Sequence, residues 1–370
     1  MRPPRLIRSF LVRRLRDHPR ARRLVEVVRD RAATALVTRR LAAPESFRPR
    51  VTNLTIAVTA HCNLRCTGCR YGRDFMPGAT LPLELLEPLF DDAQELGVRR
   101  VRLYGGEPLL HPDITTIVER AANRGLNPYV TTNATLLARR IDELWAAGLR
   151  GATIGLYGTG DDYDGYVGRK GAWRRFEDGL RTVRERYGDR FFLRLNWLLK
   201  RGTATRRHLD AALDVARDLG APVQIDLVHY SLPYFTEGPD RELQFRPEDR
   251  PDLEDLAAHL VEIHAREPGL LDHSAIGLRA IPDWLLLGPH MNVPCDKHDM
   301  LWIGADGSVQ LCYVTFPLGN LHETRLRDIV GTDAHVRAGR CALARDCPNC
   351  HCGYDSRTRT FAPTRAKYGG

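Results

Sequence analysis

Three cysteines stand close together in one short segment of the chain, at Cys62, Cys66 and Cys69. They follow an alternating apolar run at residues 54–59 that predicts a β-strand, so the thiols occupy a loop just past a strand end. Thiolates are the usual ligands of iron–sulfur clusters, and three of them leave one corner of a [4Fe–4S] cube open to a small molecule. On the triad alone, a zinc site and a buried group of thiols stay open as alternatives.

The next two predicted strand ends carry residues suited to holding a ligand. Gly105, Gly106 and Glu107 follow a strand predicted at 99–104, and two glycines let a ligand approach the backbone because no Cβ is in the way. Asn133 follows a strand predicted at 127–131. Since the carboxyl ends of parallel strands share one edge of a sheet, we expect these residues to lie beside the cysteine loop.

The spacing Cys-x3-Cys-x2-Cys resembles the radical S-adenosylmethionine (radical SAM) family. The resemblance implies that the amino and carboxylate groups of SAM chelate the open iron. An electron then cleaves SAM to methionine and a 5′-deoxyadenosyl radical, which abstracts hydrogen from an unactivated carbon. The chain departs from the family at Gly68, where an aromatic residue usually lies against adenine, and we expect Tyr71 to take over that contact.

The same resemblance assigns further residues. It implies that Gly105, Gly106 and Glu107 bind the methionyl amino group, with Asn133 near the ribose and methionyl part. At the fourth strand Gly155 stands where the family often has Ser. On the fifth strand, Arg194 and Asn196 share one face and are candidate SAM contacts if that face points inward. Tyr157 and Asp226 are candidate substrate contacts, with structural roles as the alternative.

The pattern between residues 51 and 230 alternates strands and helices, which predicts an α/β fold with a parallel sheet and outer helices. The six strands are predicted near 52–59, 99–104, 127–131, 151–157, 191–199 and 222–229, with helices near 82–96, 112–124, 137–147, 171–187 and 206–219. Six units are too few for a closed eight-stranded barrel. We therefore predict a partial (β/α)6 TIM-like barrel with a small C-terminal auxiliary-cluster domain.

Four regions are expected along the chain. Residues 1–50 form a basic helical arm and linker, 51–230 the radical SAM partial barrel, 231–294 an irregular and helical connection, and 295–370 the auxiliary domain and tail. Helices are predicted at 3–17, 20–41, 252–266 and 323–338.

The other six cysteines gather near the C-terminus. A predicted hairpin turn at 305–307 separates Cys295 from Cys312, and a dense group follows at Cys347, Cys350 and Cys352. This arrangement resembles the SPASM/Twitch extension of radical SAM enzymes, which implies auxiliary iron–sulfur clusters.

Six cysteines are too few for two fully ligated cubes, so one auxiliary [4Fe–4S] cluster on Cys295, Cys312, Cys347 and Cys350 is the simplest solution; a second is not excluded. Cys341 and Cys352 then serve as alternative ligands, inert thiols or catalytic hydrogen donors. A zinc knuckle at 347–352 is the alternative, and His351 is expected to be exposed.

The net charge of +9 comes from the arm, because residues 1–50 hold 15 Arg and four acidic residues. The remaining chain is near neutral, so we expect no nucleic-acid partner. Two interpretations of the arm stay open: contact with an anionic membrane surface, and the favoured one, a helical cap on the main domain. Cysteines in ligand-like groups and the lack of a long apolar run predict a cytoplasmic protein.

The leading hypothesis is a radical SAM oxidoreductase acting on a small molecule, such as a sugar or aminocyclitol, by dehydrogenation, epimerisation or rearrangement. An electron donor such as a flavodoxin or ferredoxin is expected. The first alternative is a maturase of ribosomally made peptides, which is disfavoured because the N-terminal 50 residues are predicted to be helical rather than a mixed leader-recognition domain. The different-class alternative is a non-catalytic zinc-binding protein with a basic arm.

Overall fold

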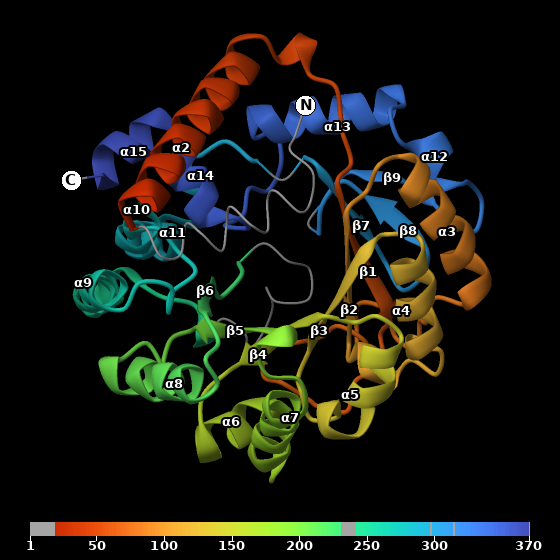
Figure 1. The fold of residues 1–370 in the computed structure, drawn as a ribbon. Coiled ribbons are helices and arrows are strands. Elements are labelled where there is room, and N and C mark those ends of the chain that lie inside the picture. Colours follow the sequence, from red (N-terminus) through yellow and green to blue (C-terminus); the bar gives the residue numbers. More distant parts are fainter. Residues whose placement is uncertain (1–18, 231–241, 297, 314, 370) are drawn as a thin grey trace.

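The computed structural model describes residues 19–230, 242–296, 298–313 and 315–369 (Figure 1). Its core is a nine-stranded sheet in the order β6-β5-β4-β3-β2-β1-β7-β8-β9. The strands are β1 (Asn53–Thr59), β2 (Arg100–Gly105), β3 (Asn127–Thr132), β4 (Gly151–Leu156), β5 (Phe192–Leu199), β6 (Val223–Leu227), β7 (Met300–Ile303), β8 (Ser308–Gln310) and β9 (Pro317–Asn320).

The first six strands run parallel and alternate with helices that cover the outside of the sheet (Figure 1). These helices are α3 (Leu83–Glu95), α4 (Ile114–Asn123), α5 (Leu137–Ala146), α7 (Ala172–Tyr187) and α8 (Arg206–Asp218). Their apolar faces pack on the sheet, with Phe90, Ile117 and Phe176 fully buried. The sheet ends at β6 on one side and β9 on the other, which confirms the predicted partial barrel.

One helix in this region was not predicted. Helix α6 (Gly160–Val167) lies between β4 and α7, where only a loop was expected. Its first turn contains Asp161 and Asp162, which suit the positive end of a helix, and Gly168 ends it in a left-handed conformation. These start and stop signals were present in the sequence, but eight residues give too short a pattern of buried positions to stand out.

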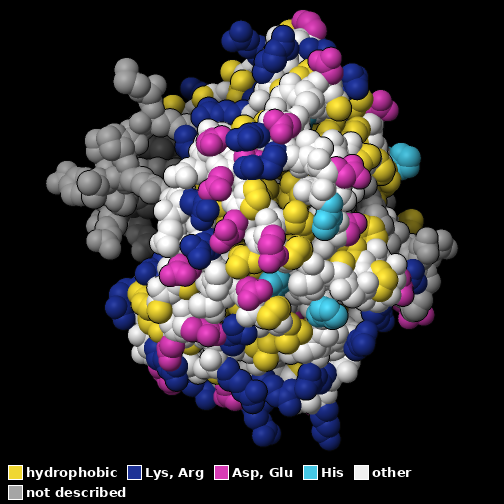
Figure 2. Space-filling model, turned by 90° about the vertical axis from the view of Figure 1, so that its right-hand side faces the viewer, with side chains coloured by type: hydrophobic (Ala, Val, Ile, Leu, Met, Phe, Trp, Pro, Cys, Tyr) yellow, Lys and Arg dark blue, Asp and Glu magenta, His cyan; other side chains and the backbone are white. Residues whose placement is uncertain are grey.

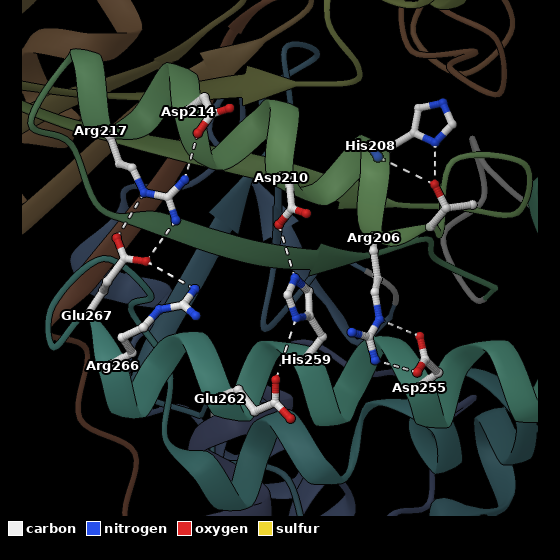
Figure 3. Close-up of polar contacts among 11 residues, drawn as sticks. Arg206, His208, Asp210, Asp214, Arg217, Asp255, His259, Glu262, Arg266 and Glu267 are labelled. Atoms are coloured by element: carbon white, nitrogen blue, oxygen red, sulfur yellow. Dashed lines mark hydrogen bonds and ion pairs between the residues drawn. The ribbon is translucent and has the colours of Figure 1, made fainter.

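The connecting segment continues the helical layer. Helix α9 (Arg250–Arg266) lies alongside α8, and a row of polar contacts joins them (Figure 3). Arg217 pairs with Glu267 at 2.8 Å, and His259 meets Asp210 at 3.0 Å. Exposed pairs of this kind contribute up to about 1 kcal/mol each, so they fix the register of the two helices more than they stabilise the fold. Two short helices follow, α10 (Ala275–Arg279) and α11 (Ile281–Leu287).

The C-terminal region joins the same sheet. Strand β7 runs parallel to β1, with Leu54 opposite Leu301, and the predicted hairpin turn connects β7 to antiparallel β8. The prediction of one helix at 323–338 was wrong, because Gly331 with φ of 88° separates α12 (Leu326–Ile329) from α13 (Asp333–Ala344). Helices α14 (Tyr354–Thr360) and α15 (Ala362–Tyr368) complete the chain.

Helix α2 (Pro19–Ala42) packs against α13 and α14 on the outside of this C-terminal region (Figure 1). Arg359 pairs with Asp30 at 3.4 Å, and Nη1 of Arg40 lies 2.7 Å from Nε2 of His298. This placement agrees with the helical-cap interpretation for residues 20–41. The helix predicted at 3–17 lies outside the described residues.

The surface carries charges of both signs. On the face drawn in Figure 2, basic and acidic side chains are interspersed over the molecule. Among the described residues, no helix combines the length and apolar character that a membrane span requires.

Candidate active site

The three thiols of the first cysteine group lie close enough to influence one another. Crowding by protein atoms raises the pKa of Cys62 to about 11, although its side chain stays accessible. The pKa of Cys66 is raised well above its usual value, first by burial and then by the charges of Cys69 and Cys62. The thiols of Cys62 and Cys66 would therefore stay protonated on their own. A bound iron–sulfur cluster supplies the positive charge that makes them thiolates, so the donor set fits that cofactor.

Helix α6 holds the cysteine loop in place. The backbone N–H of Arg65 donates to the carbonyl of Val167 at 3.0 Å, and that of Thr67 donates to the carbonyl of Tyr166 at 2.8 Å. A Cβ at Gly168 would lie 2.9 Å from the carbonyl oxygen of Arg65, so the helix end packs directly on the loop. The unpredicted helix is therefore the element that positions the thiols.

Asn63, inside the cysteine loop, ties it to the end of β3. Its Oδ1 accepts a hydrogen bond from Nδ2 of Asn133 at 2.9 Å, and its Nδ2 donates to Oγ1 of Thr135 at 2.9 Å. Oδ1 of Asn133 in turn accepts from the Thr135 hydroxyl at 2.6 Å. The side chain of Asn133 thus positions the loop, and the predicted contact of Asn133 with SAM stays a prediction.

Glu107 is fully buried and joins the ends of β2 and β3. Its carboxylate accepts hydrogen bonds from the Thr132 hydroxyl at 2.7 Å and from the backbone N–H groups of Asn133 at 2.8 Å and Leu109 at 3.1 Å. Burial raises the pKa of Glu107 to about 7, while the three donors favour the ionised form. The Glu107 side chain therefore holds the ends of β2 and β3 together. The predicted contact of Gly105, Gly106 and Glu107 with SAM would then involve their backbone atoms.

We expect Glu107→Gln to destabilise the protein by about 2 kcal/mol, because one carboxylate oxygen becomes an NH2 group that faces donors. Chemical denaturation of the apoprotein measures the change. The matched control is Glu119→Gln on α4, an exposed position. Equal stability of the two variants would contradict the bracing role.

Gly106 packs against the backbone just before Cys62. A Cβ at this position would overlap the carbonyl oxygens of His61 and Ala60. We expect Gly106→Ala to displace the cysteine loop and to weaken iron binding at the first cluster about tenfold, the size seen when groups that orient metal ligands are lost. Chelator competition measures this, with Gly165→Ala as the control because a Cβ there meets open space. Unchanged competition in Gly106→Ala would exclude the predicted displacement.

Tyr157 lies between β4 and the cysteine loop. Its ring centre is 5.0 Å from that of Tyr166, and its hydroxyl lies directly over Gly155, where a Cβ would overlap it. Burial raises the pKa of Tyr157, and the charge of Cys66 adds to the rise. Gly155 thus makes room for Tyr157 beside the first thiol group.

Tyr71 packs in a small buried cluster with Tyr104 and Trp302. It is 5% exposed, its hydroxyl lies 3.3 Å from Sδ of Met76, and its ring lies 6.2 Å from that of Tyr104. The adenine contact proposed for Tyr71 stays a prediction.

The inner faces of β2, β5 and β6 carry charged and polar side chains. Arg102 donates to the Tyr313 hydroxyl at 2.7 Å and to Oγ1 of Thr131 at 2.8 Å. Burial raises the pKa of Asp226, while the charges of Arg102 and Arg194 oppose the rise, so all three lie near one another.

Arg194 also bonds to Asp272 at 3.2 Å and to Thr153 at 3.3 Å. Two buried atoms of this inner face, Nε of Arg194 and Oδ1 of Asn196, have no hydrogen-bond partner among the described residues. A donor and an acceptor thus stay available to a ligand.

The second thiol group centres on Cys350 and Cys352. The Cys352 thiol donates to the Cys350 sulfur, which lowers the pKa of Cys350 and raises that of Cys352. Cys347 belongs to the same group. Burial is the main cause of its raised pKa, and the charge of Cys350 adds to the rise. The charge of Cys312 also raises the pKa of Cys352.

Cys352, which the sequence analysis gave only as an alternative ligand, therefore lies among the predicted ligands. Cys295 is partly buried against the core, and Cys341 lies half-buried on α13. Among the described residues, no three His, Cys, Asp or Glu side chains are arranged to enclose a single metal ion. We infer that these thiols lie close together because each changes the pKa of another. Their roles as cluster ligands stay predictions.

His351 was expected to be exposed, and this was wrong: it is 3% exposed. Its Nε2 lies 2.9 Å from the carbonyl of Val228, and the Tyr354 hydroxyl donates to the carbonyl of Ile225 at 3.3 Å. The Tyr354 contact satisfies a carbonyl of β6, and the His351 contact satisfies a carbonyl just past the end of that strand. His229, at the end of that strand, lies 3.6 Å from the Cys352 sulfur. The reason is topological, since an open barrel edge leaves carbonyls that a buried segment must satisfy.

Several residues of the site gave no signal in the sequence. They are Asn63, Arg102, Tyr313 and Arg357. The inward position of Arg102 on an alternating strand could have pointed to the barrel interior. Tyr313 and Arg357 act across long sequence separations, which no local pattern records.

Two family profiles match the two cysteine groups. Residues 56–195 match the radical SAM superfamily, and residues 295–352 match SPASM, an iron–sulfur cluster-binding domain. The chain belongs to the radical SAM superfamily. It is an enzyme whose cofactors are a SAM-binding [4Fe–4S] cluster, SAM and an auxiliary iron–sulfur cluster.

Curated relatives of this radical SAM enzyme match less than half of the chain. GTP 3′,8-cyclase of Chlorobaculum tepidum is 40% identical over 122 residues, 32% of this chain and 36% of the relative. GTP 3′,8-cyclase 2 of Pseudomonas aeruginosa is 34% identical over 46% of this chain and 51% of its own length. AdoMet-dependent heme synthase of Methanosarcina barkeri is 30% identical over 44% and 46%. The chain thus spans about a third to a half of the length of these relatives.

Solved structures share the fold across both regions. Native anSMEcpe with bound AdoMet superposes with a TM-score of 0.63 at 16% identity, covering 85% of this chain and 95% of that one. SuiB of Streptococcus suis bound to S-adenosylmethionine gives 0.59 at 15% identity, covering 79% and 68%. At these identities the likeness establishes the fold alone.

Proposed function

We propose that this radical SAM enzyme abstracts a hydrogen atom from an unactivated C–H group of a small polar molecule. The dehydrogenated, epimerised or rearranged product leaves the same site. The observation that carries the proposal is the set of charged and polar side chains between the two thiol groups. The charge of Cys66 contributes to the raised pKa of Tyr157, and the charge of Asp226 contributes to the raised pKa of Cys352, so each side chain lies near one of the thiol groups.

These side chains suit a substrate rich in hydroxyl or amino groups. Asp226 is a partly buried acceptor, Asn196 offers an unpartnered Oδ1, and Arg194 an unpartnered Nε–H. Because buried polar groups bind best when they gain hydrogen bonds, a sugar or an aminocyclitol would satisfy this set better than an apolar molecule. Sequence relatives named for GTP and heme also act on small molecules.

When bound, the clusters give and accept single electrons, one of which splits SAM into methionine and the 5′-deoxyadenosyl radical. The residues of the chain position the groups that react. The network of Asn63, Asn133 and Glu107 fixes the cysteine loop, and the inner faces of β5 and β6 orient the substrate carbon toward it. Orientation of this kind lowers the barrier because the reacting atoms meet in a productive geometry.

Isotope transfer from a mixture of cell metabolites tests the proposal. Extract from cells grown in deuterated medium is separated into small-molecule and peptide fractions, and each is incubated anaerobically with the enzyme, unlabelled SAM and dithionite. We expect 5′-deoxyadenosine with a single deuterium, in its 5′-methyl group, only with the small-molecule fraction; multiply labelled nucleoside derives from deuterated SAM in the extract and is not counted. Deuterium from the peptide fraction alone would overturn the small-molecule proposal in favour of peptide maturation.

A further inference from the structure

Arg357, on α14, is one of the largest fully buried side chains, with 2% exposure. Its guanidinium donates to the carbonyls of Val293 and of Pro294, the latter at 3.0 Å. It also donates to the carbonyls of Cys350 and of Cys352, the latter at 3.5 Å. One side chain thus holds the segment that ends at Cys295 against the segment that carries Cys350 and Cys352.

Asn349 supports the same arrangement. Its Oδ1 accepts from Nη2 of Arg357 at 3.1 Å and from the N–H of Cys350 at 3.0 Å, while its Nδ2 donates to the carbonyl of Pro289 at 2.7 Å. The residue adopts φ of 56°, a left-handed conformation that Asn tolerates better than most residues. The turn between Cys347 and Cys350 is therefore fixed by side-chain contacts.

Among the described residues, the guanidinium of Arg357 forms no ion pair with an Asp or Glu side chain. Its hydrogen-bond acceptors there are four carbonyls and an amide oxygen, all neutral, and its guanidinium carbon lies 4.8 Å from the centre of the Trp284 ring. Asp296 acts electrostatically on Cys350 and its Oδ2 accepts a hydrogen bond from Ser356, but within the described ranges it is not ion-paired with Arg357. Burying a charge without an opposite charge nearby destabilises a protein by roughly several kcal/mol.

We propose that Arg357 is a positioning residue for the auxiliary cluster and the counter-charge to its thiolates. It gathers the segments of Cys295, Cys350 and Cys352, and the negative charge of the thiolate-bound cluster compensates its buried guanidinium. A positive charge beside an iron–sulfur cluster stabilises the reduced form, so Arg357 raises the reduction potential of the auxiliary cluster.

The test separates the charge from the hydrogen bonds. Arg357→Met removes both, Arg357→Lys keeps the charge but loses the planar fork, and Arg359→Met on the same helix is the control, since Arg359 pairs with Asp30. All are made in a full-length background in which Cys62, Cys66 and Cys69 are alanine. EPR-monitored redox titration then reports the auxiliary cluster alone, and chelator competition reports its iron affinity.

We expect a more negative midpoint potential in Arg357→Met and a potential close to that of the parent protein in Arg357→Lys. Iron affinity should fall about tenfold in both, as for other groups that orient metal ligands, and stay unchanged in Arg359→Met. If Arg357→Met does not fold, Arg357→Lys still tests the proposal. Because the Lys variant keeps the positive charge, a strongly shifted reduction potential of its auxiliary cluster would overturn the proposed charge effect. Equal potentials and affinities in all proteins would overturn the whole proposal.

A second measurement compares the apoprotein with the loaded protein. If the cluster compensates Arg357, then Arg357→Met should lower the melting temperature more in the loaded protein than in the apoprotein. Equal losses would show that Arg357 acts on the fold alone. None of these readouts involves the substrate, so their failure would leave the proposed small-molecule activity untouched.

Discussion

Replacing Cys66 with alanine is expected to abolish the formation of 5′-deoxyadenosine. The three thiols of the first group act on one another, and the chain offers this cluster no spare thiol within the same loop. Loss of residues that merely orient ligands weakens metal binding by roughly 10–100-fold, so loss of a ligand itself should cost at least as much. The measurement is anaerobic incubation with SAM and dithionite, followed by chromatography of the nucleoside products.

Cys341→Ala provides the matched control for this prediction. Cys341 lies half-buried on α13, which packs against α2 and the short 3-10 turn at Pro44–Ser46. We expect Cys341→Ala to cleave SAM at the rate of the wild-type protein. Cleavage at that rate by Cys66→Ala would instead show that the assigned loop does not hold the SAM-binding cluster.

The strands of the barrel could be predicted from sequence because their signal is local. Buried parallel strands such as β4 read as apolar runs between turn residues, and their predicted bounds lie within two residues of the structure. The cysteine loop and Gly105-Gly106-Glu107 were found for the same reason, since each motif is short and stands at a strand end. Spacing along the chain was sufficient for these features.

The supports of the site were missed because they depend on distant contacts. Arg102 reaches Tyr313, and Arg357 gathers carbonyls more than 60 residues away in sequence as well as nearby ones. A buried arginine that binds carbonyl oxygens looks like any other arginine in a sequence rich in them. The wrong expectation for His351 has the same origin, because its burial follows from the open edge of β6.

The remaining prediction concerns the division of labour between the two cysteine groups. We expect Cys312→Ala to retain most SAM cleavage while product formation falls by about 100-fold or more, because under the proposed function the auxiliary cluster would take an electron from the substrate radical after hydrogen abstraction. The charge of Cys312 influences Cys352, and the adjacent Tyr313 reaches Arg102 on the inner face of β2, so the residue belongs to the auxiliary side of the barrel.

The ratio of 5′-deoxyadenosine formed to labelled small molecule consumed measures this division. In the wild-type protein the two quantities should rise together, whereas in Cys312→Ala 5′-deoxyadenosine should accumulate without matching product. Thr315→Ala is the control, since it keeps the backbone carbonyl that Cys312 contacts at 3.6 Å. An equal loss of cleavage and product in Cys312→Ala would mean that the auxiliary thiols support the first cluster directly, and that electron transfer and SAM cleavage are not separable steps in this enzyme.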